Sequence, residues 1–349
     1  MEIDRKKPSE AANVELYMQL IRFGQEESSR RKEAPIHVLR EEHEEVLLNS
    51  KTTVFIVDPR LGFNNRTHRF WKNRLPPGGE EGQKWKTVGH RHTVEAVIYW
   101  LTGHGYSIID GIRYDWSAGD ILCVPMFAWH RHVNNSDEYA YYAASTTGPL
   151  SMGLGQAVYE DERYPQFFVY AQQGDKAMKA LAPGGTEDPD FLRKTKLDTQ
   201  SQRFYAEQVS FAFHEENRRR ESKVLQKKEN IKLESTLMGH MAYAIDARLG
   251  FHVKAMSTII AEVPPGKHSG SHRHLYDEID YILEGEGQVI IDDQTYNVKQ
   301  GDTLAIPLFA WHQYFGTGDK PLRILAHNTR PAMENLGLVL TQHGEDANY

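Results

Sequence analysis

"MFAWHRH" (residues 126–132) and "LFAWHQY" (residues 308–314) carry the same tetrapeptide, Phe-Ala-Trp-His, in the two halves of one chain. The tripeptide His-Arg-His stands 40 residues before the histidine of each tetrapeptide. From the first histidine to the last, 19 of 41 positions are identical, and no gap is needed to align them. The chain of 349 residues is therefore an internal duplication.

The repeat also extends upstream of these motifs. Asp58-Pro-Arg-Leu-Gly-Phe recurs as Asp246-Ala-Arg-Leu-Gly-Phe, and a buried turn with an Asp–Arg pair and a permissive glycine explains it better than catalysis does. Before His-Arg-His the first copy has six extra residues, within residues 79–89. We expect this insert to be a solvent-exposed loop without contact to a site. The alternative is that Trp85 stacks on a substrate ring and Lys84 or Lys86 meets a carboxylate.

Each repeat contains short runs of β-branched and aromatic residues, and such runs are typical of strands that are separated by turns with Gly and Asp. In the first repeat these runs are residues 97–101, 106–110, 121–125 and 139–145. Asp110-Gly111 between two runs predicts a tight hairpin. The pattern predicts a mainly β protein with two antiparallel barrels.

Helical sequence lies outside these runs. Residues 10–33, which Ser9 opens, and residues 201–228 both place Glu-Glu and clustered Arg after a Phe, so the helix is duplicated too. Residues 182–190 (APGGTEDPD) form the best candidate linker. We therefore expect two domains, residues 1–181 and 182–349, each with a helical lead-in.

The repeated histidines indicate metal binding. His90 and His92 share one face of a strand, as do His272 and His274, because side chains alternate along a strand. A third histidine from another strand, His130 or His312, can complete a set of imidazole ligands. A lone histidine is more often a core residue, but identical spacing in two copies favours one divalent metal in each half.

The two halves differ at the fourth ligand position. Glu278 follows His274 by an even number of residues, whereas the equivalent residue of the first half is Ala96. Glu95 is one residue away, where strand alternation points it outward. We therefore expect three histidines plus a glutamate in the second half, and three histidines alone in the first. The histidine-only site leaves about three coordination positions open.

These motifs resemble those of the cupin superfamily, whose fold is a double-stranded β-helix or jelly-roll barrel. The resemblance covers both halves, so it implies two tandem cupin barrels, a bicupin. Around "HRHT" and "WHRHVN" the first half resembles gentisate 1,2-dioxygenase and related salicylate- and hydroxynaphthoate-cleaving enzymes. That resemblance implies a ferrous ion on His90, His92 and His130, with His132 as a further residue of the site. In that family the second cupin has usually lost its metal site, whereas here its motif is intact.

The resemblance implies a ring-cleaving dioxygenase that acts on a small hydroxylated or amino-substituted aromatic acid with O₂. Two alternatives stay open: a non-oxidative metal enzyme (decarboxylase, isomerase or lyase) centred on the second barrel, and a metabolite-binding bicupin without turnover. Ligand sets of this kind also accept Mn²⁺, Ni²⁺ or Zn²⁺. The exact substrate, and which barrel is catalytic, stay open as well.

The net charge, the lack of long apolar runs and the cysteine content indicate which binding partners and which cellular compartment to expect. A net charge of −7 argues against a nucleic-acid surface, and no apolar run of the length of a membrane span occurs. One cysteine, Cys123, excludes an intrachain disulfide, and the N-terminal residues lack the apolar stretch of a signal peptide. We expect a cytoplasmic protein that binds no membrane or nucleic acid, and we expect a homo-oligomer.

Overall fold

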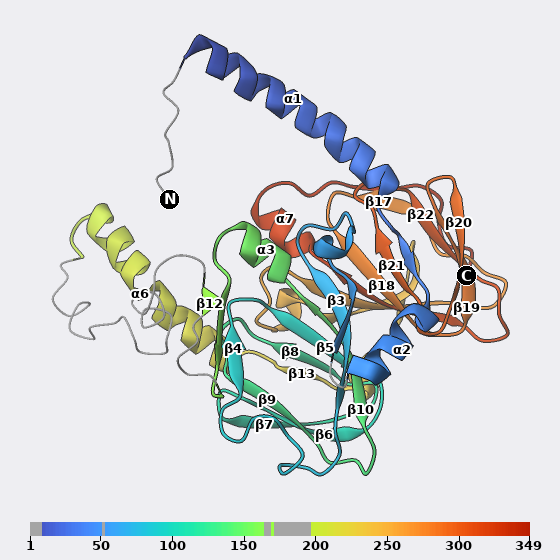
Figure 1. Cartoon of the computed structure of the whole chain (residues 1–349), viewed down its shortest axis with the longest axis horizontal. Helices are drawn as coiled ribbons and strands as arrows, with labels where there is room; N and C mark the ends of the chain where they lie inside the picture. Colours follow the sequence, from blue (N-terminus) through green and yellow to red (C-terminus); the bar gives the residue numbers. More distant parts are fainter. Residues whose placement is uncertain (1–8, 51–52, 164–168, 171–196) are drawn as a thin grey trace.

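The computed structural model describes residues 9–50, 53–163, 169–170 and 197–349, and it confirms a mainly β protein with two barrels (Figure 1). The first barrel has two antiparallel sheets. In spatial order one consists of β13 (Leu225–Gln226), β8 (Ile121–Val124), β5 (Ala96–Trp100), β10 (Ala140–Thr146), β3 (Arg69–Leu75) and β2 (Thr53–Val57). The other consists of β12 (Val169–Tyr170), β11 (Val158–Asp161), β4 (His90–His92), β9 (His130–Asn134), β6 (His104–Ile109) and β7 (Ile112–Ser117).

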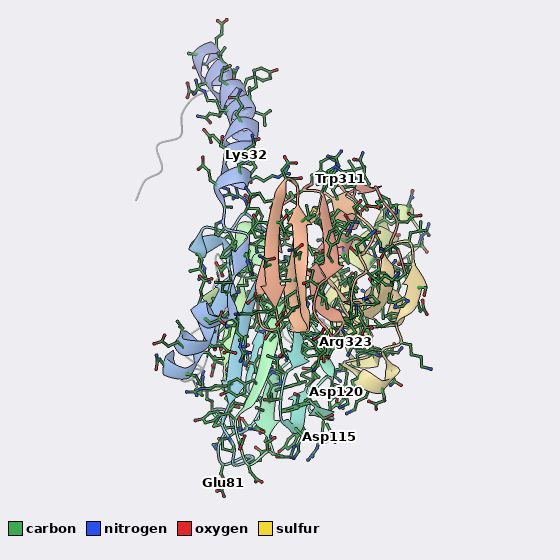
Figure 2. All side chains as sticks on the ribbon, turned by 90° about the vertical axis from the view of Figure 1, so that its right-hand side faces the viewer. Lys32, Glu81, Asp115, Asp120, Trp311 and Arg323 are labelled. Atoms are coloured by element: carbon green, nitrogen blue, oxygen red, sulfur yellow. The ribbon has the colours of Figure 1, made fainter. Side chains whose placement is uncertain are left out.

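The second barrel repeats this arrangement. Its larger sheet consists of β1 (His37–Val38), β21 (Thr303–Ile306), β18 (Glu278–Glu284), β23 (Leu322–Asn328), β16 (Ser257–Val263), β15 (Gly239–Ile245) and β14 (Glu234–Thr236). Its smaller sheet consists of β20 (Gln294–Lys299), β19 (Glu286–Ile291), β22 (His312–Gly316), β17 (His272–His274) and β24 (Thr341–His343). Figure 2 shows the barrels end to end, with Trp311 near the far end of the second and Glu81 at the far end of the first.

Side-chain alternation produces three apolar cores. Along β5, Ala96, Ile98 and Trp100 point into the first barrel, where they pack with residues of both sheets. Val97 points the other way, into a core formed between the barrels that also contains Ile279 of β18. The second barrel has its own interior core. The larger sheet of each barrel is therefore buried on both faces, which joins the two barrels into one body.

The barrels also exchange short strands. β1, which precedes the first barrel, pairs with β21 of the second, and β13, which precedes the second barrel, pairs with β8 of the first. The proposed domain boundary and the linker at residues 182–190 lie outside the described residues. Because each lead-in segment adds a strand to the other barrel, neither half completes its larger sheet alone.

The predicted lead-in helices are present as α1 (Glu10–Glu33), with Ser9 as its N-cap, and α6 (Gln200–Glu221). Their duplication is visible in their contacts: Arg31 of α1 pairs with Asp292 at 3.1 Å, and Arg219 of α6 pairs with Asp110 at 2.7 Å. Asp110 and Asp292 are the hairpin residues at equivalent positions of the two barrels, with φ of 46° and 50°. Each helix thus contacts the hairpin of the other repeat.

Three details differ from the sequence expectation. Residues 222–227 are not helical, since α6 ends at Glu221 and β13 follows. The helix α2 (Arg40–Ser50) was not predicted, and its mixed polar sequence carries little periodicity to reveal it. Short helices α3 (Gly148–Gly153) and α7 (Arg330–Asn335), and the 3₁₀ turns η1 (Pro59–Leu61), η2 (Lys228–Asn230) and η3 (Ala247–Leu249), complete the described elements.

The Asp–Arg turns are confirmed as structural features. Asp58 is 1% exposed, and its carboxylate accepts hydrogen bonds from the backbone N–H and the guanidinium of Arg60. Asp246 binds Arg248 in the same way. Gly62 closes the first turn at φ 95°, a conformation that costs residues with a Cβ more than it costs glycine.

Two buried carboxylates connect the barrels at symmetric positions. Glu95, fully buried just before β5, accepts hydrogen bonds from the backbone N–H groups of Lys254 and Ala255 in the second half. The equivalent Asp277 accepts from the backbone N–H of Arg66 at 2.5 Å and from that of Thr67 at 2.7 Å. Each barrel therefore inserts one acidic side chain into a backbone loop of the other.

Replacing Glu95 should weaken this junction in a pH-dependent way. Burial raises the pKa of Glu95 from 4.5 to about 7, although the N–H groups of Lys254 and Ala255 oppose the rise. Between pH 4.5 and 7 the folded protein holds a proton that the unfolded chain has lost, so this residue's contribution to stability falls as pH rises, by roughly 3 kcal/mol. Glu95→Gln does not titrate, and its amide N–H₂ faces a backbone donor.

We expect Glu95→Gln to lower the free energy of unfolding by roughly 1–3 kcal/mol at pH 5 and by less at pH 8. Urea denaturation at both pH values measures the difference from the unmodified protein. Glu286→Gln, an exposed carboxylate on β19, is the matched control. A cost that stays constant between pH 5 and pH 8 would contradict the assignment.

Candidate metal centres

The structure brings the three histidines of the first half together. His90 and His92 lie on β4, and His130 begins the neighbouring strand β9, where it pairs directly with His90. One ring nitrogen of each lies within 4.8 Å of the corresponding atoms of the other two. Three imidazoles at this separation can share one metal ion.

Backbone carbonyls orient two of these rings. Nδ1 of His92 donates to the carbonyl of Val94 at 2.9 Å, and Nδ1 of His130 donates to that of Ala128 at 2.8 Å. These bonds place the proton on Nδ1 and leave Nε2 free as a metal ligand. A hydrogen-bonded tautomer of this kind is the usual support of a metal-binding histidine.

Burial keeps these rings neutral. It lowers the pKa of His92 to about 4, and it lowers the pKa values of His90 and His130 well below the ordinary range, with neighbouring imidazoles adding to the effect. Neutral imidazole is the form that binds metals. The first-half cluster is therefore ready to accept a cation without first losing protons at pH 7.

The second half forms the same cluster with a carboxylate added. Ligand atoms of His272, His274, Glu278 and His312 lie within 4.8 Å of one another. Glu278 oxygens lie 3.7 Å from Nε2 of His274 and 3.7 Å from Nε2 of His312, and neither nitrogen has a hydrogen-bond partner. Buried polar atoms without partners that converge on one point fit a metal ion.

The neighbouring histidine side chains keep Glu278 in its charged form. Burial raises the pKa of Glu278, but the nearby side chains of His274, His312 and His272 outweigh this effect and lower the pKa to about 2. Burial lowers the pKa of His312 to about 4. The second cluster thus combines neutral imidazole donors with an anionic donor.

Glu278 reaches the cluster by a route that the sequence argument did not describe. His274 ends β17 in the smaller sheet, whereas Glu278 begins β18 in the larger sheet. Counting even steps along one strand was therefore the wrong reason. Glu278 faces the histidines because the two sheets face each other across the barrel.

The same geometry explains the first half. Ala96 begins β5 at the position of Glu278 and points inward, so it offers only a methyl group to the cluster. Glu95 points outward into the junction between the barrels, as strand alternation predicts. Within the part of the chain that the structure describes, no glutamate therefore joins the first cluster.

The insert of the first half reaches the metal cluster, so the expectation of a loop without contacts is wrong. Trp85 stacks on the ring of His90, with centroids 4.5 Å apart and an interplanar angle of 24°. Its indole Nε1 donates a hydrogen bond to Asp161 at 3.2 Å. The ring centroid of Tyr159 lies 5.4 Å from that of His90. Lys86 points elsewhere and donates to backbone carbonyls of the insert.

His132 lies beside the cluster but is not one of its close donors. Its ring centroid is 5.7 Å from that of His130, and its Nδ1 shares a 2.8 Å hydrogen bond with the hydroxyl of Ser107. Burial lowers the pKa of His132 to about 3. This position suits a residue that contacts a ligand next to the metal.

The second cluster opens into a cavity of about 240 Å³ inside its barrel. His272 and Glu278 line one side, and apolar residues such as Ile259 and Ile324 line much of the rest. Asp280, two residues after Glu278 on the same strand face, accepts a hydrogen bond from the hydroxyl of Tyr314. Sequence reasoning missed Asp280, although its spacing from Glu278 signals that it points into the same barrel.

Comparison with known proteins supports the fold assignment. The model of the family "Cupin domain" matches residues 72–145 and 259–328, one segment in each half. The crystal structure of salicylate 1,2-dioxygenase from Pseudaminobacter salicylatoxidans superposes with a TM-score of 0.61, at 14% identity, over 89% of this chain and 88% of that chain. Among the described residues, no helix combines the length and the apolar character needed to cross a bilayer.

Two sequence relatives are named as ring-cleaving dioxygenases. The 1-hydroxy-2-naphthoate 1,2-dioxygenase of Nocardioides sp. (strain KP7) is 25% identical over 257 residues, which cover 72% of this chain and 61% of that protein. The 5-aminosalicylate 1,2-dioxygenase of Comamonas sp. is 36% identical over 81 residues, which cover 23% of this chain and 21% of that protein. The matches thus span less than two thirds of either relative. One segment in each half of the chain therefore matches the cupin domain, and the chain has the fold of salicylate 1,2-dioxygenase.

Proposed function

We propose that this bicupin is a ferrous ring-cleaving dioxygenase that acts on a small hydroxylated or amino-substituted aromatic acid, with the first barrel as its catalytic centre. The observation that carries the proposal is the cluster of His90, His92 and His130 with Ala96 in place of a fourth ligand. The naphthoate and aminosalicylate relatives support this class of reaction.

A ferrous ion on the three histidines supplies the redox chemistry that lets an aromatic acid react with O₂. The protein's part is to hold the ligands and shape the space. Val94 and Ala128 hold the protons of His92 and His130 on Nδ1, and Trp85 covers one face of His90. The methyl group of Ala96 supplies no ligand at the position where Glu278 offers a carboxylate in the second barrel.

A second function is favoured by a separate observation. The cavity of about 240 Å³ adjoins the second cluster, where Glu278 adds an anionic ligand. Non-oxidative chemistry on an acid, such as decarboxylation or isomerisation, fits a cation that need not bind O₂. Product formed without O₂ consumption distinguishes this alternative from the dioxygenase.

The test of the proposed function is O₂ uptake by anaerobically purified, iron-loaded protein. Salicylate, gentisate, 5-aminosalicylate and 1-hydroxy-2-naphthoate form the substrate panel. Ala96→Glu places a carboxylate next to the first cluster, and we expect it to retain metal there but to lose turnover by on the order of 100-fold. Glu278→Ala is the matched variant of the other barrel and should leave turnover largely intact.

The opposite result would reassign the chemistry. If Glu278→Ala abolishes turnover while Ala96→Glu is harmless, the second barrel is catalytic. If no acid of the panel elicits O₂ uptake from fully iron-loaded protein, the dioxygenase proposal fails.

Metal stoichiometry tests the ligand sets themselves. We propose one divalent metal in each barrel, with Fe²⁺ as the metal of the first. Elemental analysis should therefore give two metal ions per chain, and His272→Ala should give one. The variant should also unfold at a lower temperature, because a metal that binds only the folded state stabilises it. His104 is an exposed histidine of the first barrel, so the control variant His104→Ala should keep both ions. Unchanged metal content in His272→Ala would disprove the ligand assignment.

We also propose that the protein is a homo-oligomer assembled through α1. None of the 24 residues of this helix is buried, although Leu16, Leu20 and Phe23 on one face are 63%, 69% and 58% exposed. Figure 1 shows α1 extending away from both barrels. An exposed apolar helix face of this kind is typical of a contact between protein chains, and most soluble oligomers are built from identical chains.

Adding charge to this face should dissociate the oligomer. Leu16→Glu with Leu20→Glu is expected to reduce the mass measured by light scattering after size-exclusion chromatography to that of one chain or a smaller assembly. Gln19→Glu with Gln25→Glu adds the same charge to polar positions of α1 and serves as the control. An unchanged mass in the leucine variant would exclude α1 as the contact.

A further inference from the structure

A cleft of about 460 Å³ lies between the two barrels, away from both metal clusters. The helix α2 forms one wall, and residues of β5, β10 and β18 form the others. Its tyrosines come from both barrels: Tyr99 and Tyr141 from the first, and Tyr281 from the second. Figure 2 shows Arg323, which lines the cleft, at the level where the strands of the two barrels meet.

Lys72 of β3 lines this cleft and is 5% exposed. Its ammonium forms an ion pair with Glu44 and lies 5.8 Å from the centroid of the Tyr281 ring. The nearest carboxylate oxygen belongs to Glu44 and is 3.7 Å away, and that oxygen already accepts from Arg40 at 2.8 Å. A buried ammonium group that must share its counter-ion with another cation is costly.

The other charged groups of the cleft have their own partners. Arg323 pairs with Glu262 at 2.7 Å, and Glu284 pairs with Lys320 at 3.2 Å. Within the described cleft, Lys72 and Arg40 therefore share one carboxylate, that of Glu44, which leaves one positive charge unbalanced. The hydroxyls of the three tyrosines also lack hydrogen-bond partners among the described residues, so they can donate hydrogen bonds to a ligand.

The duplication shows that this lysine is not required by the fold. Lys72 pairs with Ala143 in the first barrel, and Ile260 pairs with Leu325 at the same place in the second. Ile260 is part of the apolar core between the barrels. One copy thus uses an ordinary core residue where the other buries an ammonium group, so the lysine points to a ligand.

We propose that the cleft binds a small organic carboxylate with an apolar body. The carboxylate would take Lys72 as its counter-ion and accept hydrogen bonds from the tyrosine hydroxyls. Leu47, Leu101 and Leu283 supply apolar walls for the rest of the molecule. Because both barrels line the cleft, the ligand strengthens the contact between them and raises the melting temperature of the protein.

The position of the ligand is tested with 4-bromobenzoate, whose bromine is located by anomalous scattering in crystals of the metal-loaded protein. We expect a bromine site in the cleft that is absent in Lys72→Met. The variant should fold, since Ile260 shows that the position accepts an apolar side chain. Lys320→Met removes a nearby charge outside the cleft lining and should keep the site.

Calorimetric titration with benzoate measures the same site in solution. We expect Lys72→Met to lose at least tenfold in affinity and benzamide, which lacks the charge, to bind weakly. Bromine only at the metal clusters, equal binding by Lys72→Met, or binding at crystal concentration only would overturn the proposal. Inorganic phosphate that competes as well as benzoate would show that the apolar walls play no part.

Discussion

Two buried carboxylates, Glu95 and Asp277, hold the barrels against each other through backbone N–H groups of the opposite half. Each is followed by the residue that faces the metal cluster of its own barrel, Ala96 or Glu278. Because side chains alternate along a strand, the first residue of each dipeptide points into the junction between the barrels and the second points toward the cluster of its own barrel. Any shift of this strand would disturb the two together.

The junction makes the two halves interdependent. Each larger sheet is covered on one face by its own barrel's interior and on the other by the opposite barrel, and each accepts a short strand from the other half's lead-in. An isolated half would expose the core between the barrels to water and would lose the edge strand that the other half contributes. This physical arrangement favours one cooperative body over two independent domains.

The two repeats share one barrel fold but differ in the residues of their sites. The clustered histidines occupy matching strands in both barrels, but Ala96 against Glu278 changes the charge and the number of donors that each cluster offers to a metal. The insert adds Trp85 against His90 in the first barrel only. Lys72 against Ile260 is a third difference, located where the barrels meet. Two copies of one fold can therefore carry different chemistry because a few inward or junction residues changed.

The sequence by itself determined the duplication, the mainly β fold, the lead-in helices and the histidine sets. These depend on local spacing: a hairpin dipeptide, an N-cap serine and histidines at equal intervals act through neighbours a few residues away. The Asp58–Arg60 turn was predictable for the same reason, since its hydrogen bonds span two residues.

Only the tertiary structure decided the features that join distant segments. The exchange of β1 and β13, the contact of Glu95 with Lys254, and the stacking of Trp85 on His90 depend on how the sheets close and pack. Local periodicity carries no information on such contacts, so the sequence predicts a solvent-exposed loop around Trp85. Glu278 shows the limit most clearly: its place beside the histidines was predicted, but its approach from the opposite sheet is a property of the closed barrel.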